Sequence, residues 1–111
     1  MNYNNKKFRP VSNTENGEIT KKTIFLYKQE GNILTSSYQG EKIIKGHLIG
    51  LVDKNGNIDM RYHQINEKGK LMTGTCNSRP EIMENGKIRL HEKWQWTTTD
   101  NSKGSSILEE I

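Results

Sequence analysis

The sequence contains no alanine, one cysteine, two prolines and few aromatic residues. Because Cys76 is the only cysteine, the chain cannot form an internal disulfide, which fits a reducing compartment such as the cytoplasm. The first residues, Met1–Lys7, have no apolar run behind them, so we expect no signal peptide. No apolar stretch approaches the length of a membrane span, so we expect no association with a membrane.

The charge of the chain is mildly positive and evenly distributed. Lys and Arg number 17 and Asp and Glu number 13, which gives a net charge of +4, and no basic tail or block emerges. Nucleic-acid binding needs a concentrated basic stripe, so we expect no nucleic-acid partner. Lysine greatly outnumbers arginine and asparagine is frequent, a bias that we attribute to an AT-rich bacterial genome.

Glycine residues divide the chain at intervals suited to β-strands. Three Asn-Gly pairs, at 16–17, 55–56 and 85–86, predict type I′ hairpin turns, because both residues tolerate a positive φ. Isoleucine, a β-branched residue that favours strands, is frequent in the chain. These marks leave about eight extended segments, at 7–14, 18–30, 33–39, 42–53, 57–66, 70–79, 86–98 and 104–110.

Side-chain alternation supports strands in these segments. Segments 57–66 and 86–98 alternate apolar and polar residues with period two, as half-buried strands do. Segment 42–53 has apolar residues on both phases, which predicts a bulge at Gly46 or Gly50, or burial of both faces. The last segment could begin a short helix, but we expect a closing strand because it would pair an otherwise open edge.

Short connections between consecutive segments favour an antiparallel meander. We therefore predict an all-β fold, an up-and-down meander of about eight strands that closes into a barrel. The chain length predicts a single domain over residues 1–111. The interior of such a barrel is filled by side chains or holds one small ligand.

Several segments resemble a family of small bacterial β-barrel proteins. The resemblance extends over nearly the whole chain and is carried by Asp59–Tyr62, Leu71–Cys76, Arg89–Glu92, Trp94–Trp96 and Leu108–Glu110. It implies a calycin-like fold, the architecture of lipocalins and avidins. Some members carry the label N-acetylglutamate synthase. The chain has no Gly-x-Gly turn that could hold the pyrophosphate of coenzyme A, so we do not expect acetyltransferase activity.

The stretch RLHEKWQW, residues 89–96, places a carboxylate in line with the most apolar side chains. Glu92 shares its strand phase with Leu90, Trp94 and Trp96, so an inward orientation of this phase would remove the carboxylate from water. Burial raises the pKa of a carboxyl group, which suits a general acid or a receptor for an amine or hydroxyl. The alternative is a structural Glu bonded to Tyr, Thr or Arg. Glu92 is the best single candidate for a site residue.

Aromatic side chains supply the other candidates. The two tryptophans and Tyr27, Tyr38 and Tyr62 could line a pocket for an apolar or ring-shaped ligand, or could form the core. Met60 shares a strand phase with Tyr62. The predicted ligand-binding residues are therefore Glu92, Trp94, Trp96, Tyr62, Tyr38 and Met60.

Other site chemistry has little support in the sequence. His47, His63 and His91 lie on three different segments without the local spacing of metal ligands, so we expect neither a metal site nor a haem. Cys76 has no adjacent histidine, which predicts a buried, inert thiol. We expect no cofactor.

Three functions follow from the predicted fold. The first is a cytoplasmic barrel that binds a small, largely apolar ligand in its interior. The second is an enzyme of the same architecture that uses Glu92 as a general acid or base. The third is a barrel with a filled core that acts through its surface, as a homodimer or by binding another protein. An internal cavity would separate the third function from the other two.

Overall fold

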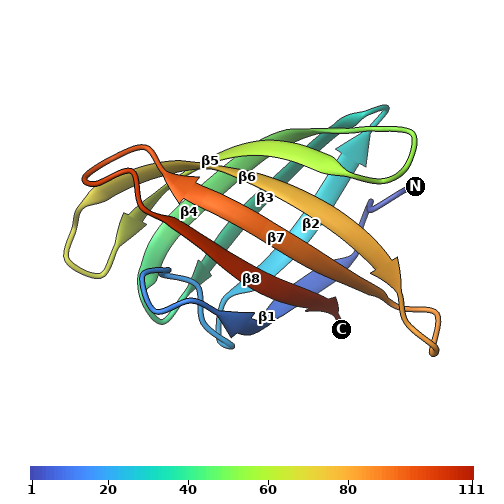
Figure 1. The fold of residues 1–111 in the computed structure, drawn as a ribbon, viewed down its shortest axis with the longest axis horizontal. Coiled ribbons are helices and arrows are strands. Elements are labelled where there is room, and N and C mark those ends of the chain that lie inside the picture. The colour runs from blue at the N-terminus through green and yellow to red at the C-terminus, as the bar shows by residue number, and fades with distance from the viewer.

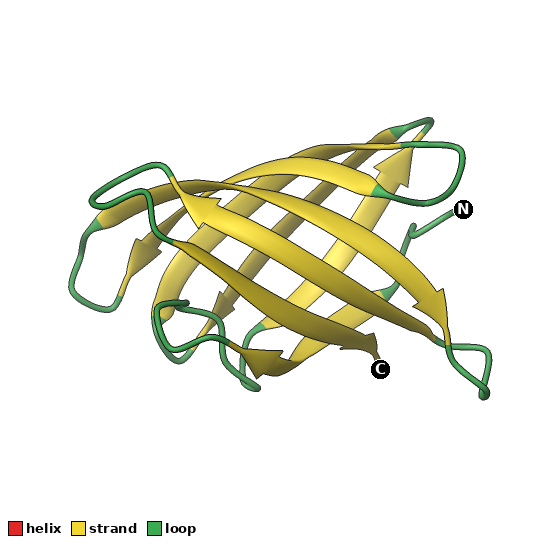
Figure 2. Ribbon diagram, viewed as in Figure 1, coloured by secondary structure: helices red, strands yellow, loops and turns green.

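Eight antiparallel strands form a closed barrel in the computed structural model, which describes residues 1–111 (Figure 1). Loops join all the strands and no helix is present (Figure 2). Each strand pairs with the next in sequence, and β1 pairs with β8 to close the sheet. The predicted up-and-down barrel is confirmed, as is the closing strand at the end of the chain. The strands are β1 (Lys7–Asn13), β2 (Ile24–Glu30), β3 (Ile33–Gly40), β4 (Ile43–Val52), β5 (Ile58–Asn66), β6 (Leu71–Ile82), β7 (Ile88–Trp96) and β8 (Lys103–Glu110).

The connections between strands gather at the two ends of the barrel (Figure 1). One end, here called the mouth, holds the β1–β2, β3–β4, β5–β6 and β7–β8 connections. The opposite end, here called the base, holds the other three connections and both chain termini. Side chains of alternate residues on every strand point into the barrel, as the period of a β-strand requires. The buried apolar core comprises Tyr3, Phe8, Phe25, Tyr27, Leu34, Tyr38, Ile43, Leu48, Val52, Ile58, Met60, Met72, Cys76, Ile88, Leu90, Trp94, Trp96 and Leu108.

The apolar residues on both phases of β4 have an explanation that differs from the prediction. The strand has a bulge, as predicted, but its register shifts lie between Ile43 and Gly46, so the position expected, Gly46 or Gly50, is wrong by a residue or more. Burial of both faces is wrong as well, because Ile49 and Leu51 point outward and are 51% and 56% exposed. The outer surface of β4 is simply apolar.

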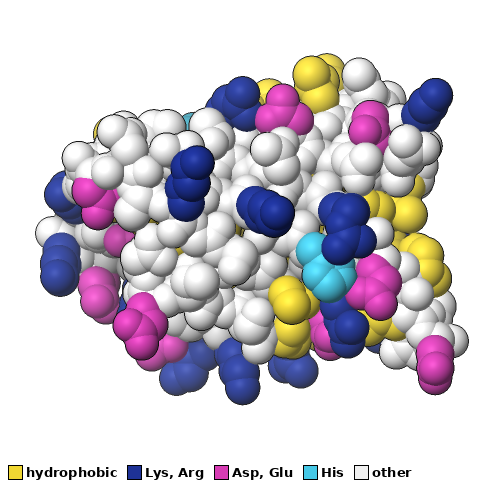
Figure 3. All heavy atoms as spheres, viewed as in Figure 1, with side chains coloured by type: hydrophobic (Ala, Val, Ile, Leu, Met, Phe, Trp, Pro, Cys, Tyr) yellow, Lys and Arg dark blue, Asp and Glu magenta, His cyan; other side chains and the backbone are white.

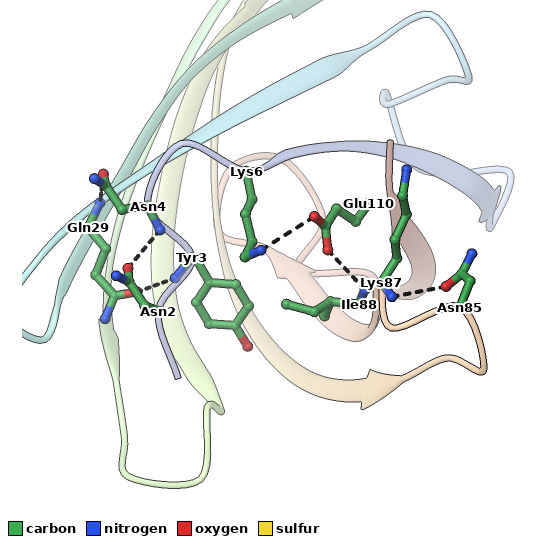
Figure 4. Close-up of polar contacts among 9 residues, drawn as sticks. All are labelled: Asn2, Tyr3, Asn4, Lys6, Gln29, Asn85, Lys87, Ile88 and Glu110. Carbon is green, nitrogen blue, oxygen red and sulfur yellow. Dashed lines mark hydrogen bonds and ion pairs between the residues drawn. The ribbon is translucent and has the colours of Figure 1, made fainter.

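The Asn-Gly turns also differ from the predicted type. Only the glycine has a positive φ, +83° at Gly56 and +84° at Gly86, whereas a type I′ turn needs it at both central residues. In the β6–β7 turn the N–H of Gly86 donates to the carbonyl of Met83, and the N–H of Met83 donates to the carbonyl of Lys87. This is a type I turn followed by a left-handed residue. The Asn85 side chain accepts from the N–H of Lys87 (Figure 4).

The segment predicted as a strand at 18–30 begins too early. Residues 14–23 form the longest connection in the barrel, and β2 starts only at Ile24. This connection, here called the lid, lies across the mouth and forms part of the wall of the interior cavity. The Asn16–Gly17 pair lies within the lid and makes no tight hairpin. Ile19, which favoured a strand, packs on the core from the lid instead.

The N-terminal residues before β1 cover the base of the barrel (Figure 4). Tyr3 is fully buried, its N–H donates to Gln29 Oε1 at 2.8 Å, and its hydroxyl donates to a carbonyl of the β4–β5 turn. Nearby, the Glu110 carboxylate accepts from Lys6 Nζ at 3.4 Å and from the N–H of Ile88 at 3.1 Å. These contacts tie the start of the chain to β2, to the β4–β5 turn and to β8, and so cover the base.

Charged side chains of both signs are interspersed on the face of the barrel that Figure 3 shows. Arg89 and Glu109 pair at 2.7 Å across β7 and β8, and Arg61 and Asp59 pair at 2.7 Å on β5. No helix of the structure is long and apolar enough to cross a membrane.

Gly104 supplies the space that the Trp94 ring occupies. The two residues are opposite each other in the β7–β8 register, and a Cβ atom added at Gly104 would overlap the indole ring. We expect Gly104→Ala to lower the free energy of unfolding by about 1–3 kcal/mol, because overpacking displaces the ring. Urea denaturation measures the change. Ser105→Ala, an exposed neighbour on the same strand, is the control and should stay within about 0.5 kcal/mol. Equal midpoints for the two variants would show that the ring is not held in this position.

Candidate functional site

A cavity of about 50 Å³ lies inside the barrel beneath the lid. One water needs roughly 10–15 Å³ of such volume, so the cavity has room for a few waters and not for a larger molecule. Ten of its sixteen lining residues are hydrophobic. The polar side chains that line it are Asn13, Glu18, Gln64, Glu92 and Ser106.

The structure brings all the predicted ligand-binding residues together around this cavity. They come from β3, β5 and β7, so strands that are distant in sequence share one interior site. Whether these residues bind a ligand stays a prediction. The six are Glu92, Trp94, Trp96, Tyr62, Tyr38 and Met60.

The Glu92 carboxylate is buried, with 7% of the residue exposed, and each oxygen accepts one hydrogen bond. Ser78 Oγ donates to Oε2 at 2.8 Å and Ser106 Oγ donates to Oε1 at 3.0 Å. Both serines are directly opposite Glu92 in the register, one on each neighbouring strand. Burial raises the pKa of Glu92 to about 7, although the two serine hydroxyls oppose the shift. The partners of the carboxylate are therefore serines, not the Tyr, Thr or Arg expected from the sequence.

Two buried polar atoms in the cavity wall have no hydrogen-bond partner. One is the hydroxyl of Tyr27, a fully buried residue, and the other is Asn13 Oδ1. Burial, and then the nearby charge of Glu92, raise the pKa of Tyr27 well above its ordinary value of 10.0. The hydroxyl therefore stays neutral and can donate. Unpaired buried polar groups are rare because each costs about 1–3 kcal/mol, so these two atoms are the polar atoms of the wall that are free to form a further hydrogen bond.

Aromatic rings form most of the remaining wall. Trp94 and Trp96 meet edge to face with their centroids 5.6 Å apart, and Tyr62 meets Trp96 at 5.7 Å. Phe25 and Tyr38 lie 4.6 Å apart on the other side of the interior. Burial raises the pKa of Tyr38 and of Tyr62 above the ordinary value, so both hydroxyls are neutral. The site is a largely apolar chamber with neutral hydroxyls and two carboxyl groups, Glu92 in the interior and Glu18 at the lid.

The lid is attached to the barrel through polar contacts. Its Glu18 carboxylate accepts from Gln64 Nε2 and from Asn66 Nδ2, each at 2.8 Å. The indole N–H of Trp96 donates to the carbonyl of Asn16 at 2.9 Å. These bonds hold the middle of the lid over the cavity, between its attachments to β1 and β2.

Sequence reasoning missed the polar residues at the mouth. Gln64 and Asn66 continue the inward phase of Tyr62, so extending the alternation to the end of the strand could have found them. Glu18 and Asn13 had no such signal. Glu18 lies on a loop that no periodicity describes, and Asn13 is the last residue of β1, where the strand meets that loop.

The histidines and the cysteine lie outside any metal-binding arrangement. His47 and His63 stack on the outer surface with their ring centroids 5.5 Å apart, and His91 Nε2 lies 2.7 Å from Glu81 Oε1. No group of three metal-ligating side chains occurs in the structure. Cys76 is buried, and burial raises the pKa of its thiol well above the ordinary 9.0, as an inert thiol requires.

The chain belongs to the avidin-like protein family, because the family model described as Avidin-like protein matches residues 1–111. The predicted calycin-like barrel is confirmed by this match together with the eight-stranded closed sheet. No curated protein matches the chain. An avidin-like barrel is a fold suited to binding small molecules.

The raised pKa of Glu92 predicts a specific pH dependence of stability. The ordinary value is 4.5 and the folded value about 7, so between these pH values the folded state retains a proton that the unfolded state has released. The free energy of unfolding should therefore fall by about 3 kcal/mol as the pH rises through this window. Glu92→Gln should remove most of this fall and should be more stable than the wild type at pH 8. Urea denaturation between pH 4 and 9 measures both curves.

The control for this measurement is Glu67→Gln, an exposed residue of the β5–β6 turn. Its curve should follow that of the wild type. Parallel curves for the wild type and Glu92→Gln would show that Glu92 ionises normally in the folded protein.

Proposed function

We propose that the protein binds a small, largely apolar ligand inside the barrel, with a polar group of the ligand bonded to Tyr27 and Glu92. The observation that supports this most is the buried Tyr27 hydroxyl, which lines the cavity without a partner. A hydroxyl that served only the core would be expected to have one. Avidin-like proteins bind small ligands such as biotin, which agrees with an interior site.

The polar groups of the cavity indicate what the ligand offers. The Tyr27 hydroxyl donates, Asn13 Oδ1 accepts, and Glu92 either donates or accepts according to its protonation. A ligand that offers both an acceptor and a donor, as an amide or a hydroxyl does, would match the bonding capacity of these atoms. The rest of the ligand would lie against the rings of Trp94, Trp96 and the neighbouring aromatic residues.

Entry of such a ligand requires displacement of the lid. With the lid in place, the cavity of about 50 Å³ is too small for a molecule of more than a few heavy atoms. The lid provides Gly17, Glu18 and Ile19 to the cavity wall, so moving it enlarges the cavity and opens the mouth in one step. The rest of the wall is strand and can remain in place.

Native mass spectrometry of the freshly purified protein is the direct test. We expect a mass above that of the chain that is lost on denaturation, and biotin is the first compound to titrate into the emptied protein. Tyr27→Phe should weaken ligand binding about tenfold, because one hydrogen bond is lost. Without ligand, Tyr27→Phe should be as stable as the wild type or more stable, because it removes a hydroxyl that has no partner.

Tyr3→Phe is the matched control. The Tyr3 hydroxyl is bonded, to the carbonyl of Gly56 at the base, so its loss should cost about 1 kcal/mol of stability and leave ligand binding unchanged. A bare wild-type mass, together with a Tyr27→Phe variant as destabilised as Tyr3→Phe, would favour a barrel with a filled core. The same spectra report whether the chain forms the homodimer of the third function.

A second function, acid–base catalysis by Glu92, is favoured by one observation. A carboxyl group with a pKa of about 7 can donate or accept a proton near neutral pH. Both of its oxygens already accept serine hydroxyls, which is why binding is the primary proposal. Analysis of the released compound distinguishes the two, since an enzyme would yield a chemically different compound from the wild type and from Glu92→Gln.

A further inference from the structure

Two buried side-chain amides at the mouth hold a carboxylate of the lid. Gln64 and Asn66, only 3% and 7% exposed, donate from Nε2 and Nδ2 to the two oxygens of Glu18 at 2.8 Å each. Glu18 takes part in none of the ion pairs of the protein. A carboxylate is therefore bound here by neutral donors, one to each oxygen.

Both amides are oriented by bonds that do not involve Glu18. The Tyr38 hydroxyl donates to Gln64 Oε1 at 2.8 Å. The N–H groups of Lys68 and Lys70 donate to Asn66 Oδ1 at 3.1 and 3.0 Å. Because both amide oxygens are occupied, both NH₂ groups must face the position of the Glu18 carboxylate. The donors thus form a site that persists when Glu18 leaves.

Glu18 lies on the lid, the element that must move when a ligand enters. Its departure would leave the donors of Gln64 and Asn66 without an acceptor, which costs free energy unless another acceptor arrives. A depression outside this point is lined by Lys42 and Lys68 and by two acids, Glu18 and Glu67. Once Glu18 has left, two lysines face one remaining acid, so an approaching anion would meet a small excess of positive charge next to the site.

We propose that Gln64 and Asn66 form a carboxylate-binding site that Glu18 of the lid fills in the ligand-free protein and that a carboxylate of the ligand fills in the loaded protein. This inference rests on the proposed function and narrows it, since it makes the ligand a small carboxylic acid with an apolar body. The carboxylate remains at the mouth while the body extends toward Tyr27 and Glu92. Glu18 then acts as an internal competitor that closes the empty barrel.

Acetate is a probe that tests the site without the rest of the ligand. Glu18→Ala frees the two amides, so we expect acetate to shift the side-chain NH₂ signals of Gln64 and Asn66 in ¹H–¹⁵N spectra in a saturable manner. The affinity should exceed that of the wild type at least about tenfold, because the competing carboxylate is gone. Acetamide, which is neutral, and chloride at equal ionic strength should give no such shift. Glu15→Ala, an exposed acid on the same lid, should behave as the wild type.

Glu18→Gln keeps the shape of the side chain and covers the case in which Glu18→Ala fails to fold. Its single amide oxygen can satisfy only one of the two donors well, so acetate should bind it more tightly than the wild type. Equal acetate affinity in the wild type and in the folded Glu18 variant, or an equal response to acetamide, would overturn the inference. Acetate is too short to reach Tyr27 from the mouth, so the acetate titration is independent of the Tyr27→Phe measurement. Either the carboxylate site at the mouth or the ligand site in the interior can therefore be disproved without the other.

Discussion

Pairing of β1 with β8 makes a closed barrel out of a meander, and the interior depends on that closure. A closed sheet has no exposed edges and only two surfaces, so every second side chain is enclosed by the others. The chain has no alanine, and large Ile, Leu, Tyr and Trp side chains fill this space. Glycine on facing positions then becomes necessary, as at Gly104 beneath Trp94 and at Gly46 beneath Tyr38. The cavity is the part of the interior that these side chains leave unfilled.

Closure also forces polar side chains into the interior, and the protein satisfies them unequally. Glu92 cannot leave the inner face without breaking the β7 alternation, so serines from both neighbouring strands bond its oxygens. Tyr27 is equally enclosed, yet its hydroxyl has no partner. The sheet therefore provides two hydrogen-bond partners for Glu92 and none for the Tyr27 hydroxyl, although Tyr27 is close enough for the charge of Glu92 to raise its pKa. This inequality is the basis for the ligand site proposed inside the barrel.

The parts of the fold and of the site that the sequence could predict are those that follow from the alternation of side chains along strands. Period two in 86–98 placed Glu92, Trp94 and Trp96 on one face, because a strand allows only two directions for its side chains. The same rule would have found Gln64 and Asn66, had the alternation been extended to the end of β5. The lid escaped prediction because Ile19 and Thr residues in 18–23 favour a strand, whereas loop contacts, including those of Glu18, decide its path. The predicted type I′ turns were wrong for a related reason. The turn type depends on hydrogen bonds between the flanking strands and not only on the Asn-Gly pair.

The lid connects the two parts of the site. While Glu18 is bonded to Gln64 and Asn66, it is present at a high effective concentration, because it is part of the same chain. A free carboxylate alone competes poorly against it, because the apparent affinity of any ligand is its intrinsic affinity multiplied by the fraction of barrels that are open. A ligand that also bonds Tyr27 and Glu92 gains interactions that Glu18 cannot make, so it can displace the lid where acetate cannot. Recognition at two points would then select for length as well as for charge: an acid too short to reach from the mouth to the interior leaves the lid closed.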